Sequence, residues 1–136
     1  MKKTEFVSGR PAPGEFAAYA QADLDLVEGD DAVTALLRQR HQTVALFHQF
    51  GEVGGGVSYA PGKWTVKQVL GHLADYDVVR SASISLFRGL DETAWVRQGI
   101  VNGYVASPRG LAFHIAGHEL HHHRVLHERY LPALGT

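Results

Sequence analysis

The chain has 136 residues, a formal net charge of −1 at neutral pH and no cysteine. This length predicts a single domain spanning residues 1–136, and the interspersed charges offer no basic surface for nucleic acid. Without cysteine there can be no disulfide, thiolate nucleophile or Cys-type zinc site, so a metal would be held by His, Asp, Glu and water. We identify no signal peptide or membrane span, which predicts a cytoplasmic protein without membrane contact.

The first part of the chain predicts an irregular arm, a short helix and one long helix. Residues 1–13 contain Gly and Pro and predict the arm, and residues 15–20 predict a short helical segment that packs as a strap. A long helix is expected to begin with a cap at Asp30 or Asp31 and to end near Phe50. Its expected apolar stripe consists of Val33, Leu37, Val44 and Phe47.

A glycine-rich segment and a capping signal predict the start of a second long helix. Residues 51–62 contain three adjacent glycines and a Pro-Gly pair, so this segment is expected to be a loop. Thr65 at the N-cap and Gln68 three residues later form a capping box, in which each side chain bonds the backbone of the other. The second helix is expected to continue to about Arg88, before a glycine.

The last part of the chain predicts one more long helix. Residues 91–98 are expected to be briefly helical, and the rest of the segment before Ser107 is expected to be a loop or small turn. Ser107 as N-cap and Pro108 at the first helical position predict a final helix that ends near Tyr130 and Leu131. The predicted fold class is all-α, with three substantial helices and a short fourth element.

Six of the nine histidines lie in this last predicted helix. Because residues four apart share a helix face, His118 and His122 can direct two imidazoles at one point. Both occur in the apolar rhythm of Leu111, Ile115 and Val125, which predicts that they face a core. A buried imidazole needs a partner for its nitrogen, and a divalent ion provides one. For a single histidine, the ordinary alternative is a hydrogen bond within the core.

A third ligand is expected in the second helix. His41 and His48 lie off the apolar stripe of the first helix and are expected to face solvent, which leaves His72 as the candidate. Asp75, three residues after His72, is a candidate to orient that imidazole or a water molecule.

Two blocks of the sequence resemble the DinB superfamily, specifically its YfiT-like branch. They are Tyr59–Lys67 leading into Gly71–Asp75, and His114–His122. The resemblance implies an up-and-down helical bundle of four-helix type, commonly a dimer. Members of this family bind a divalent ion through one histidine early in the second helix and an HxxxH pair in the last. The metal ligands that it implies are His72, His118 and His122.

The resemblance also implies an activity, which is metal-dependent hydrolysis or transfer of a low-molecular-weight thiol such as bacillithiol or mycothiol. Three histidines leave a coordination position open, as in catalytic sites, and such a shell suits zinc, nickel or iron. A bound ion there can lower the pKa of water or activate a thiolate. For thiol transfer, Lys63, Lys67 and Arg80 are candidates to contact a charged cosubstrate.

One departure from the family pattern concerns the third helix. Only residues 80–112 separate the two blocks, so residues 81–90 are expected to be the end of the second helix or a shortened third helix. The bundle is then incomplete, and we expect a second subunit to cover its exposed apolar flank in a homodimer.

The run His118–His122 also fits HExxH, the signature of zinc peptidases in which Glu119 is the general base. No Gly-x-x-His extension follows, and no strand is predicted to hold a peptide, so this function is the weaker candidate. Glu119 is rotated by about 100° from His118 and is expected to point outward or across to a partner.

The remaining histidines of the last helix receive different expectations. His121 is a candidate proton shuttle beside the metal, or a surface residue. His123 and His127 are expected to face solvent. His114 shares the face of His118 but lies about 12 Å along the helix from His122, too far for all three to bind one ion.

A function of another class stays open at this point. The metal site could be structural or vestigial in a non-catalytic dimeric scaffold or stress-response protein.

Overall fold

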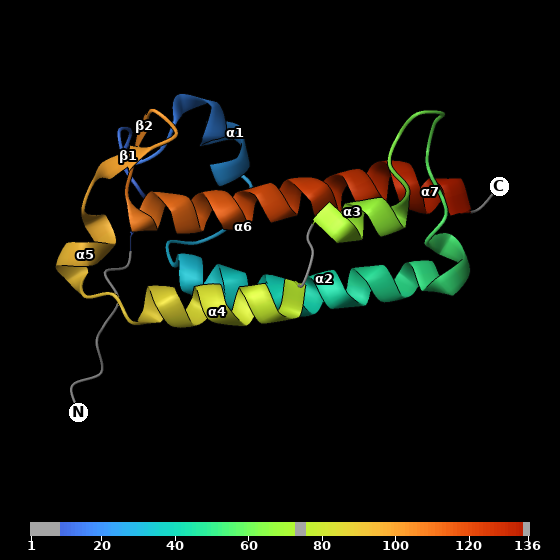
Figure 1. Ribbon diagram of the computed structural model, residues 1–136, viewed down its shortest axis with the longest axis horizontal. Helices are drawn as coiled ribbons and strands as arrows, with labels where there is room; N and C mark the ends of the chain where they lie inside the picture. The colour runs from blue at the N-terminus through green and yellow to red at the C-terminus, as the bar shows by residue number, and fades with distance from the viewer. Residues whose placement is uncertain (1–8, 73–75, 135–136) are drawn as a thin grey trace.

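The computed structural model describes residues 9–72 and 76–134, which fold mostly into helices, as expected for the all-α class (Figure 1). The helices are α1 (Gln21–Leu24), α2 (Ala32–Gly54), α3 (Val66–His72), α4 (Tyr76–Arg88), α5 (Glu92–Val96), α6 (Pro108–Val125) and α7 (Leu131–Leu134). A 3-10 turn at Ala18–Ala20 precedes α1, and a π-helical turn at Leu126–Tyr130 joins α6 to α7. Within these described residues, every helix is too short or too polar to cross a membrane.

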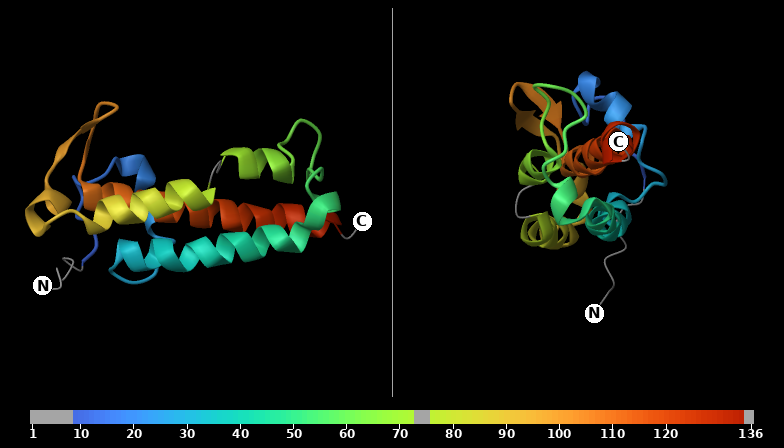
Figure 2. Two further views of the ribbon diagram at one scale, coloured as in Figure 1. Left: turned by 60° about the horizontal axis from the view of Figure 1, so that its bottom comes forward. Right: turned by 90° about the vertical axis from the view of Figure 1, so that its right-hand side faces the viewer.

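The two longest helices, α2 and α6, run side by side along the molecule (Figure 1). Helices α3 and α4 follow one another along this pair, each beside one half of it. Helix α4 packs beside α2 in one half, and α3 packs near the end of α6 in the other half. Seen along the long axis, α3 and α4 lie on the same side of the α2–α6 pair (Figure 2).

Helix α2 begins where its sequence predicts. The Asp31 side chain accepts hydrogen bonds from the backbone N–H groups of Val33 and Thr34, at 2.9 and 3.2 Å, and so caps the helix. The expected end near Phe50 corresponds to a kink, because Gly51 has a φ of 61° inside the helical run. One further turn follows, so the loop that we expected to begin at Gly51 begins after Gly54.

The segment expected as one second helix is described as two helices. The capping box is confirmed: the Thr65 N–H donates to Gln68 Oε1 at 2.8 Å, and the Gln68 N–H donates to Thr65 Oγ1 at 3.2 Å. However, α3 ends at His72, and α4, which begins at Tyr76, is offset from it (Figure 1). Of the two alternatives expected for residues 81–90, a separate short helix describes them better than the end of one continuous second helix, because the 13-residue α4 packs on α2.

A small β-hairpin lies where we expected a loop or turn. Strand β1 (Gly99–Val101) pairs antiparallel with β2 (Tyr104–Ala106). Both turn residues have positive φ, 49° at Asn102 and 82° at Gly103, as a type I′ turn requires. The brief helix expected before it is confirmed as α5, which Asp91 caps.

The segment before α2 crosses α6 as a strap, which we define as residues 9–24. The Glu15 carboxylate accepts hydrogen bonds from Ser107 Oγ at 2.8 Å and from the Arg109 guanidinium at 2.8 and 3.0 Å. Burial raises the pKa of Glu15, but Arg109, the Ala12 N–H and Ser107 together outweigh burial and hold this pKa below its ordinary value. The strap is thereby fixed to the N-terminus of α6.

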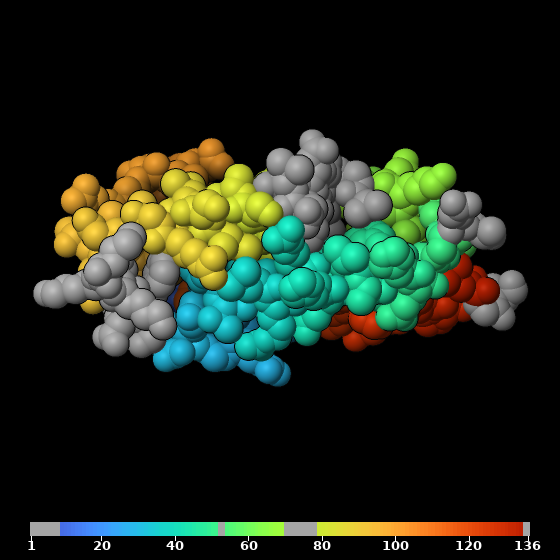
Figure 3. All heavy atoms as spheres, turned by 90° about the horizontal axis from the view of Figure 1, so that it is seen from below, coloured from blue at the N-terminus to red at the C-terminus, as the bar shows by residue number. Residues whose placement is uncertain are grey.

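The described core consists of two apolar clusters with a polar layer between them. One cluster includes Leu36 and Phe113, and the other includes Leu46 and Leu126. The polar layer between them contains the buried residues Gln39, Thr43, Arg80, Glu119 and His123. Figure 3 shows α2 and α4, which supply the first three of these residues, forming one face of the molecule.

Candidate metal site

Helix α6 carries the clustered histidines. Ser107 caps it, with its Oγ accepting from the Gly110 N–H at 3.0 Å, and Pro108 occupies the first turn, as predicted. The helical path continues past the predicted end near Tyr130 and Leu131, because the π-helical turn leads into α7. Pro132 lies in the first turn of α7, where a missing N–H is tolerated.

The stripe of buried residues on α6 is shifted by one position towards the C-terminus from the stripe that we predicted. The observed buried positions keep the same four-three spacing but begin at Ala112 rather than Leu111. His118 is consequently 46% exposed at its side chain, and His122 is partly exposed, at the edge of the bundle. The prediction that both histidines face the core is wrong. The stripe with this spacing runs from α6 into the π-helical turn, with Gly110, Phe113 and Gly117 buried beside it, and consists of Ala112, Ala116, Glu119, His123, Leu126 and Tyr130.

His118 and His122 nevertheless converge. Their Nε2 atoms lie 3.1 Å apart, and their ring centroids lie 4.6 Å apart. Two imidazole nitrogens bound to one tetrahedral ion at about 2.0–2.1 Å are separated by roughly 3.3 Å. The pair therefore fits two positions of one metal coordination sphere.

Asp23 of α1 faces this histidine cluster, and sequence reasoning did not find it. Its Oδ2 lies 3.6 Å from His118 Nδ1 and 3.7 Å from His114 Nε2. These separations are longer than hydrogen bonds, so Asp23 acts on the two rings through its charge. Its charge favours a proton on His118 Nδ1, which places the lone pair of that ring on Nε2. Burial lowers the pKa of His114, the Asp23 carboxylate opposes this, and His118 adds to the lowering.

Gly117 explains how α1 comes close enough to present Asp23. A Cβ atom at Gly117 would lie 3.0 Å from Leu24 N and closer still to the Asp23 carbonyl. Only glycine permits this approach of two backbones. The signal in the sequence was a glycine inside a helix, directly before a histidine.

The third expected ligand and its expected orienting group lie at the junction of α3 and α4. His72 is the last residue of α3, and its side chain lies outside the described part of the structure. Asp75 also lies outside the described residues. Among the side chains that are described, no three His, Asp or Glu groups are arranged to hold a metal ion.

His121 is partly buried and borders a pocket together with His122. Its ring stacks near that of His118, with centroids 6.5 Å apart, and its Nδ1 lies 3.4 Å from an Arg124 guanidinium nitrogen. This position beside the His118–His122 pair is compatible with the expected proton-shuttle role.

Glu119 points into the bundle rather than outward or towards a partner. It is 2% exposed, and its Oε2 accepts a hydrogen bond from Arg80 Nη2 at 2.6 Å. Arg80 also donates to the Leu36 carbonyl at 3.1 Å. This placement removes Glu119 from the side of α6 that carries His118 and His122. A general-base role for Glu119, and with it the HExxH function, is not supported.

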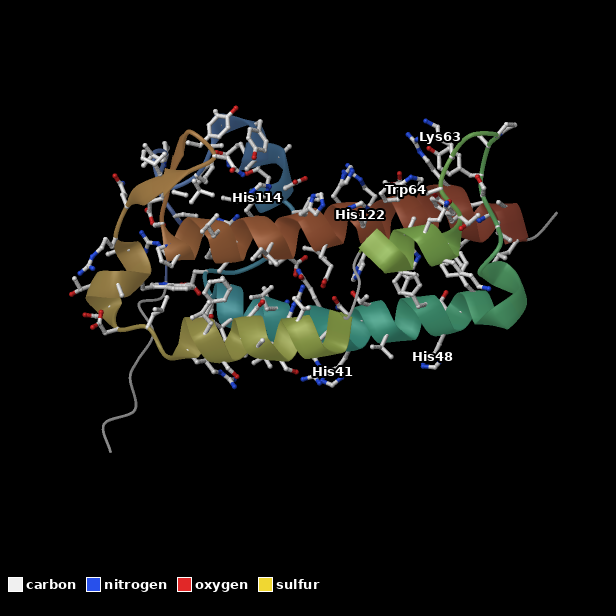
Figure 4. The ribbon with its side chains drawn as sticks, viewed as in Figure 1. His41, His48, Lys63, Trp64, His114 and His122 are labelled. Carbon is white, nitrogen blue, oxygen red and sulfur yellow. The ribbon has the colours of Figure 1, made fainter. Side chains whose placement is uncertain are left out.

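The remaining histidines divide between the core and the surface. His123 is buried and bonded to the Thr43 hydroxyl, so the expectation that it faces solvent is wrong. Burial lowers the pKa of His123 to about 4, with His127 and Arg80 contributing in the same direction. Exposed positions are confirmed for His127, His41 and His48, and Figure 4 shows the last two on the side opposite His122.

Of the three cations expected to contact a cosubstrate, only Lys63 borders the pocket beside His122. Lys67 is exposed outside the pocket lining, and Arg80 is buried in its ion pair with Glu119. Arg129 borders the pocket instead, and sequence reasoning did not single it out.

A scan against protein-family models finds no match for this chain, and neither does a search of curated proteins or of solved structures.

Proposed function

We propose that the protein binds one divalent metal ion through His72, His118 and His122 and acts on a small-molecule substrate, as a DinB-like protein of the YfiT-like branch. Zinc and nickel are the first candidates for the ion, with iron as the third. The reaction that we propose is hydrolysis or transfer of a low-molecular-weight thiol. A cytoplasmic location belongs to the same proposal.

The observation that carries the proposal is the 3.1 Å separation of His118 Nε2 and His122 Nε2, with Asp23 beside His118 Nδ1. At this separation the two nitrogens need either a proton between them, as in an N–H···N hydrogen bond, or a cation that both bind. The carboxylate of Asp23 favours a proton on His118 Nδ1, and in that tautomer Nε2 carries the lone pair that would bind a cation.

The position of α3 supports His72 as the third ligand. His72 follows Val69 by one helical turn, and Val69 borders the same pocket as His122. A ligand from α3 and two from α6 would join two helices that meet beside this pocket.

Each remaining residue of the site has a role in this proposal. Asp23 orients His118, and His121 exchanges a proton with substrate in the pocket. When bound, a divalent ion in an open three-histidine site lowers the pKa of water or of a thiol. Glu119 and Arg80 stabilise α6 from inside the bundle.

The test is metal content, measured by elemental analysis of untagged protein. We expect about one divalent ion per chain, with loss of the ion in the single variants His72→Ala, His118→Ala and His122→Ala. Matched controls are His41→Ala and His48→Ala, which remove exposed histidines on the opposite side. A wild-type protein that neither contains nor takes up zinc or nickel contradicts the proposal.

The second step of the test is turnover. The metal-loaded protein is assayed for loss of free thiol from N-acetylcysteine in the presence of an aryl chloride, and for hydrolysis of an aryl ester. Activity that disappears in His118→Ala supports an enzyme. Full metal occupancy without activity, together with a collapse of the melting temperature in His72→Ala, favours the alternative of a non-catalytic scaffold or stress-response protein.

We also propose a homodimer. Val79 and Leu86 on α4 are 54% and 63% exposed, and their spacing of seven residues places them on one face of the helix. Val44 of α2, on which α4 packs, is 45% exposed. Sedimentation is expected to give a dimer at micromolar concentration, and Leu86→Glu is expected to weaken it without changing metal content. A strictly monomeric wild type contradicts this part of the proposal.

A further inference from the structure

A pocket of about 430 Å³ lies directly beside the His118–His122 pair, at the junction of the 59–64 segment, α3 and the end of α6. In Figure 4, Lys63, Trp64 and His122 lie on the same side of the molecule. Its volume is within the range of small-molecule sites. Its described lining is formed by Tyr59, Gly62, Lys63, Trp64, Val69, His121, His122, Val125, Leu126, Arg129 and Tyr130.

The charge of this lining is one-sided. Lys63 and Arg129 are cations, and the described lining contains no carboxylate, although the chain has 14 acidic residues. The Arg129 guanidinium donates to Tyr59 Oη at 3.2 Å and lies 5.3 Å from the centre of the Tyr59 ring. This contact holds the guanidinium at the pocket while leaving it further N–H donors. The positive charge of Lys63 and Arg129 therefore favours binding of an anion in this pocket.

The body of the pocket is aromatic and apolar. Trp64 is 49% exposed, although tryptophan is highly buried on average. The segment that carries it is fixed, because Tyr130 Oη donates to the Trp64 carbonyl at 2.7 Å and Ser58 Oγ donates to the Lys63 carbonyl at 3.0 Å. The Tyr59 and Tyr130 rings meet edge to face at 5.0 Å. A flat apolar ligand can contact these groups without disturbing them.

We propose that this pocket binds a small organic carboxylate with a flat, apolar body. The carboxylate contacts Lys63 and Arg129, the body lies against Trp64, and the opposite end reaches His122. Arg129 suits a carboxylate because a guanidinium can bond both oxygens. Only the role of the opposite end rests on the proposed function, because the anion-binding part requires no metal. The pocket thereby assigns a substrate class to the site beside it.

The test compares 2-naphthoate with its uncharged analogue 2-naphthamide, titrated into metal-free protein. Binding is followed by the indole N–H signals in proton–nitrogen spectra. Trp64 reports on the pocket. Trp95, which is 3% exposed and belongs to the apolar cluster of Leu36 and Phe113, serves as an internal control. We expect the Trp64 signal to shift and naphthoate to bind about fivefold to tenfold more tightly than naphthamide.

Charge variants test the assignment of the cations. In Lys63→Gln/Arg129→Gln, we expect naphthoate affinity to fall to that of naphthamide, with naphthamide affinity unchanged. The matched control Lys67→Gln/Arg88→Gln removes the same charges from exposed positions outside the pocket lining. Equal loss of naphthoate binding in the control overturns the proposal, as do equal affinities of the wild type for both probes or a shift of Trp95 alone.

A repeat in metal-free His118→Ala separates this inference from the proposed function. Retained naphthoate binding in this variant supports the pocket even if the wild type takes up no metal. If the wild type binds metal but shows no preference for naphthoate, the metal proposal stands and the carboxylate pocket is refuted.

Discussion

Replacing Gly117 by alanine tests the contact that brings Asp23 to the histidines. A Cβ at this position would lie 3.0 Å from Leu24 N and nearer still to the Asp23 carbonyl. These neighbours are backbone atoms, so no change of rotamer relieves the overlap. An ordinary contact is restored only if α1 moves away by roughly 1.5 Å.

Two effects of opposite sign determine the magnitude. Forcing a methyl group into a closed contact costs about 1–3 kcal/mol. Alanine is better than glycine inside a helix by about 0.8–1.0 kcal/mol. The difference between these ranges is a loss of about 0–2 kcal/mol in the free energy of unfolding. We expect Gly117→Ala in the upper half of this range, at about 1–2 kcal/mol, because the overlap is with backbone atoms that only a movement of α1 can relieve.

The assay is urea unfolding of the metal-free protein. The control is Gly56→Ala, where an added Cβ would meet nothing within 4 Å and φ is outside the left-handed region. We expect the control to leave stability unchanged or to raise it by about 0.5 kcal/mol. If Gly117→Ala is as stable as the wild type or more stable, the added methyl group meets no steric overlap, and the close approach of α1 to α6 is refuted.

Three further predictions concern the site and the polar layer. Asp23→Asn is expected to weaken zinc binding by about tenfold to a hundredfold in a chelator competition. The exposed control Asp25→Asn should have no effect. If Asp23→Asn binds zinc as tightly as the wild type, Asp23 is not part of the site. Glu119→Gln is expected to lower the free energy of unfolding by about 3 kcal/mol, because Arg80 stays buried and charged without its partner. The double variant Arg80→Met/Glu119→Leu should recover most of this loss. If Glu119→Gln is as stable as the wild type in urea unfolding, the ion pair does not contribute to stability. Folding lowers the pKa of His123 from 6.5 to about 4, so as the pH falls the unfolded chain binds this proton before the folded chain does. The contribution of neutral His123 to the free energy of unfolding is therefore complete above about pH 6.5 and is lost progressively between pH 6.5 and pH 4. His123→Gln should flatten the pH dependence of unfolding in this window, and an unchanged slope would show that His123 does not titrate as a buried group.

The helix starts were predictable because their signals are local. Asp31, the Thr65–Gln68 pair and Ser107 each bond a backbone group within three residues, so the sequence contains both partners. The hairpin was missed although Asn102-Gly103 is a strong turn signal, because each strand has only three residues.

The helix registers were not predictable from apolar spacing. In α2 the expected stripe included Val44, which is 45% exposed, whereas Thr43 one position earlier is buried. In α6 the stripe was assigned to the face of Leu111, whereas Ala112 and His123 are buried. Both errors have one cause. The polar layer puts hydrophilic side chains into the core, and their partners come from distant parts of the chain.

The convergence of His118 and His122 was nevertheless predicted, because it depends on a different property of the helix. A spacing of four residues places two side chains on one face whichever face is buried, so an error of register rotates both together. The error changed their surroundings instead: the pair lies at the edge of the bundle, where Asp23 of the strap and the pocket lined by Lys63 and Trp64 approach it. These neighbours come from segments distant in sequence, and the close packing at Gly117 and the fixed 59–64 segment help to bring them to α6. A pair buried in the core would be closed to substrate, whereas a pair at this edge is open to a ligand from the side of the pocket.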